Sequence, residues 1–201
     1  MRKLAKMLNQ VSDRSGTLGF TGLKEVEKPA VATFLSIDNQ SDLEVMAISD
    51  MSAILVTDYS ILESYTPPDS VLVGLDLRLR NEISNESHYG KINFAVVDLG
   101  TNLGVIDNED CGLILEIELS EDTKDVTELI QLLQGKQALP IDAILLSGNL
   151  ATEINIIKNQ LNIRRFNEAV GLPLVIAEHA TNADTDQLRA LGIKGSLVTS
   201  G

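Results

Sequence analysis

Eight short apolar segments, rich in Val, Ile and Leu, recur along most of the chain and constrain its fold more than any other feature. They are 31–37 (VATFLSI), 53–57 (AILVT), 71–77 (VLVGLDL), 94–99 (FAVVDL), 112–119 (GLILEIEL), 143–147 (AILLS), 172–177 (LPLVIA) and 195–199 (GSLVT). Most are apolar at consecutive positions, which is typical of strands that are covered on both faces, as in parallel sheets. Parallel strands need crossover connections, so the pattern predicts an α/β fold.

Several gaps between these segments carry apolar residues at helical spacing. The predicted helices are 41–50, 122–134, 152–170 and a shorter one over 184–191. Gly135, Gly171 and Gly192 stand where three of them should end. The gaps after the second, third and fourth strands are polar, broken by Pro, or too short for a long helix. We therefore expect reduced helices there.

This alternation of eight strands with helices in 201 residues resembles a small TIM, or (β/α)8, barrel. The segments LRALGIKGSLVTSG (188–201) and ISDMSAILVTD (48–58) resemble corresponding segments of the phosphate-binding group of these barrels, which includes the tryptophan-biosynthesis and ribulose-phosphate types. The resemblance implies the fold and identifies no specific family. The alternative that shares the same pattern is an open, doubly wound parallel sheet.

An additional helix is predicted at the N-terminus, where Leu4, Met7, Leu8 and Val11 form a one-sided apolar stripe. The sequence stops directly after the eighth strand, so we expect no helix there. We expect the helix within 1–14 to cover the bottom of the barrel or to replace that last helix; the alternative is a helix that binds a membrane surface or a partner. The chain is interpreted as one domain, 1–201, with the barrel over 31–201.

Three of the predicted strands resemble one another. SAILVTD (52–58), DAILLSG (142–148) and KGSLVTS (194–200) share a small residue, an apolar centre and a small polar end. We interpret the similarity as a shared packing requirement, in which the small residue lets the preceding helix end approach the strand closely.

Charge and composition exclude several classes of partner. The chain has 16 Lys and Arg against 29 Asp and Glu, a formal net charge of −13, and no basic stripe for duplex DNA or an anionic membrane. The single cysteine, Cys111, cannot form an intramolecular disulfide. No apolar segment approaches the roughly 20 residues of a membrane-spanning helix. We therefore expect a cytoplasmic protein.

Carboxylates stand at most of the strand ends, where barrels of this kind carry their active sites. The strongest candidates are Asp58, Asp76, Asp98 and Glu116, which would supply a general base. Asp76, Asp98 and Glu116 would also hold a metal ion, with Mg²⁺ as the cofactor. A carboxylate within an apolar strand needs a partner, and Arg78 is the best candidate to pair with Glu116. The competing interpretation of Glu116 is a structural ion pair.

Other strand ends offer weaker candidates. Ser147, Gly148, Asn149, Thr199 and Ser200 would cradle an anion, although Gly148-Asn149 also fits a turn and helix cap. At the end of the seventh strand, Glu178 and His179 are candidate acid/base residues, and only one of the two can face the barrel mouth. Cys111 lies in an acidic stretch that should raise the pKa of its thiol, which disfavours a nucleophile.

Two functions remain open at this level. The first is a lyase or isomerase that acts on a small oxo, carboxylated or phosphorylated metabolite, with Arg78 holding an anionic group. The second is a non-catalytic barrel that serves as a binding or assembly module. The short connections after three strands should leave apolar wall uncovered, so we expect a homodimer.

Overall fold

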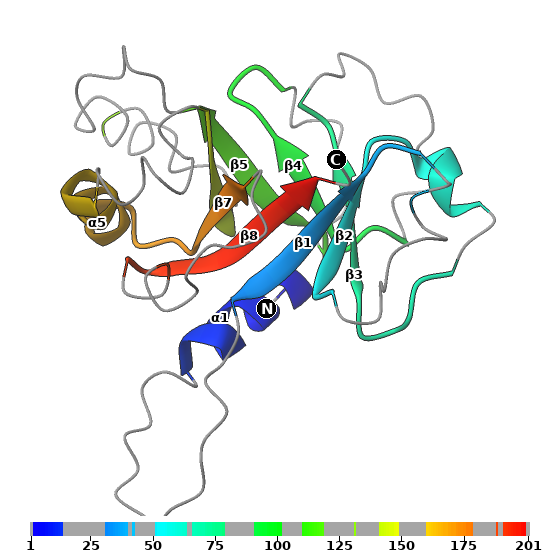
Figure 1. Cartoon of the computed structure of the whole chain (residues 1–201), viewed down its shortest axis with the longest axis horizontal. Coiled ribbons are helices and arrows are strands. Elements are labelled where there is room, and N and C mark those ends of the chain that lie inside the picture. Colours follow the sequence, from blue (N-terminus) through cyan, green and yellow to red (C-terminus); the bar gives the residue numbers. More distant parts are fainter. Residues whose placement is uncertain are drawn as a thin grey trace, which may run out of the picture.

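The computed structural model of the chain describes residues 2–13, 31–39, 42, 51–63, 66–78, 91–101, 110–118, 131, 141–148, 160–178, 188 and 191–199. The strands are β1 (Ala32–Ile37), β2 (Ala53–Val56), β3 (Leu72–Asp76), β4 (Phe94–Val97), β5 (Gly112–Glu118), β6 (Ala143–Ser147), β7 (Leu174–Glu178) and β8 (Ile193–Thr199). The helices are α1 (Lys3–Asp13), the 3₁₀ helix η2 (Tyr59–Leu62) and α5 (Gln160–Val170) (Figure 1).

The strands form a closed barrel in sequence order, β1 to β8, in which every neighbouring pair is parallel. The pairing of β1 with β8 closes the sheet and excludes the open doubly wound alternative. All eight predicted strands are therefore confirmed, and so is the TIM-type barrel.

Alternate residues of each strand face the barrel interior and the surrounding layer. In β1, for example, Phe34 belongs to the interior cluster, whereas Leu35 and Ile37 belong to the outer one. Both clusters consist of buried apolar side chains, so the strands are covered on both faces. This double burial is the physical reason for the uninterrupted apolar runs in the sequence.

Apolar layers fill the barrel interior. In an eight-stranded barrel the strands tilt, and side chains from alternate strands share a layer. The registers give one layer of Ala53, Phe94, Ala143 and Gly195, a second of Phe34, Gly74, Ile114 and Val175, and a third of Leu55, Val96, Leu145 and Leu197.

Two phenylalanine rings occupy the centre of these layers. Phe34 and Phe94 meet edge to face, with ring centroids 5.6 Å apart. A Cβ on Gly74 would lie 2.2 Å from the Phe94 ring, and one on Gly195 would lie 2.8 Å from the Phe34 ring. The glycines thus provide the space that the two rings occupy, because large and small side chains must alternate in a closed interior.

Helix α1 covers the N-terminal end of the barrel. This confirms the prediction that the helix covers the bottom of the barrel. Figure 1 shows it beneath the start of β1, and it contacts β1, β5 and β8. Leu4 and Leu8 are fully buried and join the interior cluster. Arg2, just before the helix, makes an ion pair of 2.8 Å with Asp142, which also accepts a hydrogen bond from the backbone N–H of Leu113.

The described part of the predicted helix 152–170 is α5, and it ends where the sequence indicated. Gly171 adopts a φ of 66° and donates its N–H to the carbonyl of Asn167, which is a glycine helix stop. The other predicted crossover helices and Gly135 lie almost wholly outside the described residues. Within the described ranges, no helix is long and apolar enough to cross a membrane.

Candidate functional site

Polar side chains replace the apolar layers at the C-terminal end of the barrel. Continuing the registers and the in–out alternation places Ser36, Asp76, Glu116 and Ala177 in one layer above the apolar ones, followed by Thr57, Asp98, Ser147 and Thr199. The first of these layers comes from the odd-numbered strands and the second from the even-numbered ones. We call these eight residues the mouth layers.

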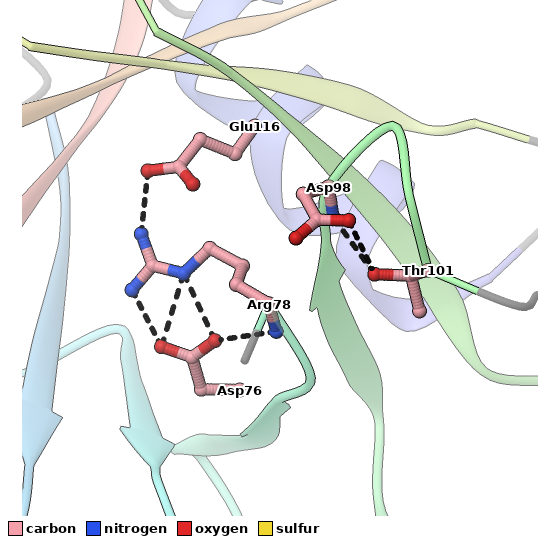
Figure 2. Close-up of polar contacts among 5 residues, drawn as sticks. All are labelled: Asp76, Arg78, Asp98, Thr101 and Glu116. Carbon is pink, nitrogen blue, oxygen red and sulfur yellow. Dashed lines mark hydrogen bonds and ion pairs between the residues drawn. The ribbon is translucent and has the colours of Figure 1, made fainter. Parts of the chain in front are cut away.

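Arg78 joins Asp76 and Glu116 across the mouth (Figure 2). Its Nε donates to both carboxylate oxygens of Asp76, at 2.9 and 3.1 Å, and its Nη2 donates to Asp76 Oδ2 at 2.5 Å. Its Nη1 donates to Glu116 Oε1 at 2.6 Å. The predicted pairing of Arg78 with Glu116 is confirmed, and Asp76 is a second partner that binds through two guanidinium nitrogens.

The three side chains are shielded but reachable from solvent. The exposed fractions of the side chains are 12% for Asp76, 19% for Glu116 and 22% for Arg78. The hydrogen bond to Asp76 is the main reason that the pKa of Arg78 lies above its ordinary value, and burial acts in the opposite direction. Three of the five guanidinium N–H groups are used in this way, which leaves two for other acceptors, and the role of Arg78 toward an anionic group stays a prediction.

Asp98 lies beside this group, but its hydrogen bonds stabilise the turn over residues 98–101. Its Oδ1 accepts hydrogen bonds from the backbone N–H of Gly100 at 2.8 Å and from Thr101 Oγ1 at 2.9 Å. The Thr101 hydroxyl in turn accepts from the backbone N–H of Asp98. Figure 2 shows the two hydrogen bonds between Asp98 and Thr101, and it shows none between Asp98 and Arg78. One carboxylate oxygen therefore stabilises the chain reversal after β4.

The predicted metal site does not fit this geometry. Among the described residues, no group of three or more His, Cys, Asp or Glu side chains is arranged to hold a metal ion. Instead of a metal ion, the Arg78 guanidinium joins Asp76 and Glu116, while Asp98 is bound to its turn. Because Arg78 already supplies the counter-charge, we derive no step that uses Mg²⁺.

Asp58 has a local role that the sequence analysis did not assign. It is the N-cap of η2, and its Oδ1 accepts a hydrogen bond of 2.9 Å from the backbone N–H of Ser60. Asp58 lies two residues beyond the end of β2 and is exposed. The structure thus gives no support to Asp58 as a catalytic residue.

The candidate anion-binding residues are only partly described. Ser147 is buried at the end of β6, Gly148 follows it with a φ of 90°, and Thr199 is exposed at the end of β8. Asn149, His179 and Ser200 lie outside the described residues, as does the side chain of Glu178, which ends β7. The proposed anion cradle therefore remains a prediction.

Ser36 is a mouth residue that the sequence analysis missed. It is 7% exposed, and its hydroxyl makes no hydrogen bond within the described part of the chain. Its segment reads VATFLSI, so the serine looked like one polar residue near the end of an apolar strand. Counting inward positions from Phe34 would have found it, because Ser36 is the next residue on the same face.

Cys111 is buried at the opposite end of the barrel, immediately before β5. Burial is the main cause that raises the pKa of its thiol to about 11, while the charge of Arg2 lowers the pKa and that of Asp142 raises it. The predicted direction of the pKa shift is confirmed, but its cause is burial together with Asp142 and not the acidic residues that precede Cys111 in the sequence. A thiol that stays protonated at neutral pH is a poor nucleophile.

Comparisons with known proteins give a fold and no family. No protein-family model matches the chain, and no curated protein does. The carboxyl transferase domain of pyruvate carboxylase from Rhizobium etli aligns with a TM-score of 0.60 at 12% identity, covering 84% of this chain and 40% of that chain. This chain thus spans well under half the length of that structure.

Two further structures cover most of both chains. The CutC protein of Streptococcus agalactiae, assigned to copper homeostasis, has a TM-score of 0.57 and 15% identity, and the alignment covers 84% of this chain and 98% of that one. The type I 3-dehydroquinate dehydratase of Clostridium difficile has a TM-score of 0.57 and 9% identity, with 86% and 85% covered. Structural neighbours thus include enzymes of small carboxylated metabolites. This chain has the TIM-barrel fold that these proteins share.

Proposed function

We propose that the protein is a lyase or isomerase that removes a proton from a small oxo metabolite bound at the mouth layers. The observation that carries this proposal is the Asp76–Arg78–Glu116 group, which stands at the end of the barrel where enzymes of this fold carry their active sites. Its three members are 12–22% exposed, so a ligand can reach them.

Glu116 is the proposed general base. Its Oε1 is fixed by Arg78, and its Oε2 accepts no hydrogen bond from any residue that the structure describes. An oriented carboxylate with one oxygen available can take a proton from the carbon next to a carbonyl group. In a compound with a hydroxyl on that carbon, return of the proton to the former carbonyl carbon, with transfer of the hydroxyl proton to the former carbonyl oxygen, would complete an isomerisation. Departure of a group from the β-carbon with the electron pair of the enolate would complete a lyase reaction.

Asp76 and Arg78 are proposed to position Glu116 and not to act on the substrate directly. Asp76 fixes the guanidinium through Nε and Nη2, which directs Nη1 toward Glu116. The general resemblance to barrels that act on small carboxylated metabolites is compatible with this chemistry, but it concerns the fold alone.

Deuterium exchange measured by proton NMR tests the proposal. The full chain is incubated in D₂O with a panel of small oxo compounds, and the signal of the proton next to each carbonyl is followed. We expect enzyme-dependent loss of that signal for at least one compound. Glu116→Gln keeps the shape of the side chain and an acceptor for Arg78, and it should slow the exchange by about 100-fold or more.

The matched control is Glu168→Gln, which changes an exposed glutamate on α5, outside the mouth layers. This variant should exchange at the wild-type rate. No exchange with any compound, or equal exchange by wild type and Glu116→Gln, would contradict the proposed function.

A further inference from the structure

Two buried serines form part of the mouth layers, beside the charged group. Ser36 is 7% exposed and Ser147 is 9% exposed. On β1, Ser36 follows the inward residue Phe34 on the same face, and on β6, Ser147 follows the inward residue Leu145. Neither hydroxyl forms a hydrogen bond with another residue in the described ranges. A buried hydroxyl that lacks a partner is energetically unfavourable, so such groups usually serve a ligand or water.

The two serines lie in the same or the next layer of the barrel as Asp76 and Glu116. Ser36 occupies the layer of Asp76 and Glu116, and in a barrel of eight strands β1 stands opposite β5. Ser147 lies in the next layer, on β6 beside β5. The charged groups thus come from β3 and β5, and the buried hydroxyls come from strands that flank or face them.

The charges around the mouth indicate which ligand fits. Among the mouth residues that the structure describes, the three carboxylates of Asp76, Glu116 and Asp98 outnumber the one guanidinium of Arg78, so this described part is net negative. Arg78 is engaged by two of these carboxylates. A phosphate or carboxylate group would therefore meet repulsion without a cation to neutralise it. Carboxylates accept hydrogen bonds from O–H groups, and serine hydroxyls can donate to a carbonyl oxygen.

We infer that the substrate is an uncharged hydroxy-carbonyl compound, and that Ser36 and Ser147 bind its oxygen atoms. This inference rests on the proposed function and narrows its substrate class, which otherwise includes carboxylated and phosphorylated compounds. The hydroxyl groups of the compound donate to the mouth carboxylates, and its carbonyl oxygen accepts from a serine hydroxyl.

Matched compounds separate the substrate classes. The three-carbon set is dihydroxyacetone, dihydroxyacetone phosphate and hydroxypyruvate, which share a hydroxymethyl ketone and differ in charge. The six-carbon set is fructose, fructose 6-phosphate and fructuronate, which likewise share a hydroxymethyl ketone and differ in charge. We expect Glu116-dependent deuterium exchange with an uncharged member and at least tenfold slower exchange with its charged counterparts. Exchange with only charged members would overturn this inference and leave the proposed function standing, whereas no exchange at all would overturn both.

Ser36→Ala gives a second and independent measurement. It removes the hydroxyl without adding volume, so the ligand-free protein should melt at the same temperature as wild type or higher, because no described hydrogen bond is lost. The apparent affinity for the uncharged compound should fall roughly tenfold, and Ser36→Thr, which restores a hydroxyl, should recover part of it.

The control for this variant is Ser196→Ala. Ser196 is also buried, at 9% exposure, but it lies between the inward residues Gly195 and Leu197 and so faces the outer layer. This control should bind the compound like wild type. A lower melting temperature for ligand-free Ser36→Ala together with unchanged affinity would assign Ser36 a structural role and overturn the inference.

Discussion

Gly74 illustrates how one residue can decide the packing of the whole interior. Any side chain there would collide with the Phe94 ring, because even a Cβ would stand 2.2 Å from two ring atoms. The Phe94 ring and Gly74 lie within the central interior layers. The backbone there cannot move away from the ring without disturbing the neighbouring strands.

We expect Gly74→Ala to reduce the free energy of unfolding by about 3 kcal/mol, measured by urea denaturation, because overpacking of a closed core cannot relax. The control is Gly171→Ala, where a Cβ meets nothing within 4 Å but φ is positive, and the expected loss is about 1 kcal/mol. Replacing Phe94 by Leu in the Gly74→Ala background should restore stability in part. An equal loss for the two glycine variants would refute this account of the packing.

Cys111 makes a pH-dependent contribution with a defined sign. Burial raises the pKa of its thiol from 9.0 to about 11, so the folded chain holds this proton more tightly than the unfolded chain. The stabilisation is complete below pH 9 and is lost as the pH rises to 11.

Between these pH values, wild type should lose about 2 kcal/mol more of its free energy of unfolding than Cys111→Ala does, because only wild type carries the thiol. Urea denaturation of both proteins across this range measures the difference. If the free energy of unfolding changed with pH in the same way for both proteins, burial would not raise the pKa of the Cys111 thiol, and this account would be wrong.

At the scale of elements, α1 belongs to the barrel core and is not an appendage. Leu4 and Leu8 are fully buried against the interior cluster, and Gly112 packs directly beneath Leu4, where a Cβ would be 2.9 Å away. The helix therefore replaces water at the N-terminal end of the barrel with apolar surface.

Leu8→Ala should lower the free energy of unfolding by about 3 kcal/mol, the loss expected for a large buried aliphatic side chain. Lys6→Ala, on the exposed side of the same helix, should change it by less than about 0.5 kcal/mol. Chemical denaturation followed by circular dichroism measures both. If the two variants lose the same amount, α1 does not pack as described.

Strand positions could be predicted from the sequence because burial on both faces leaves an uninterrupted apolar run. The fourth predicted segment, 94–99, ended two residues too late, because Asp98 already begins a side-chain-stabilised turn.

The similarity of segments 52–58, 142–148 and 194–200 was correctly attributed to packing, but the small residues pack against different partners than the sequence analysis expected. Ala53, Ala143 and Gly195 face the barrel interior around the two Phe rings, and not the preceding helix ends.

The candidate site could be predicted only in part. Arg78 and Glu116 were paired because a carboxylate in an apolar strand demands a cation, and that argument needs no three-dimensional information. Asp58 was taken as a mouth residue because its side-chain direction depends on where β2 ends. The inward face of Ser36 could have been predicted by counting from Phe34, but its place in one layer with Asp76 could not, because barrel closure and stagger link these residues 40 positions apart.

At the scale of the molecule, the homodimer remains a prediction. It was expected because short connections should leave apolar wall uncovered. Among the residues that the structure describes, Leu99, at 40% exposure, is the one exposed large hydrophobic residue. The connections over 79–90 and 102–109 lie outside the described residues. Light scattering at micromolar concentration should report the mass of a dimer, and a monomer mass would contradict the prediction.

The helix at the base of the barrel also bears on steady-state kinetics. Because α1 and the apolar layers close one end, a small molecule bound among the mouth layers can exchange with water only at the other end. Substrate and product must then enter and leave by the same route. Product that rebinds at the mouth layers would block the entry of substrate, so an isomerase of this kind would show competitive inhibition by its own product.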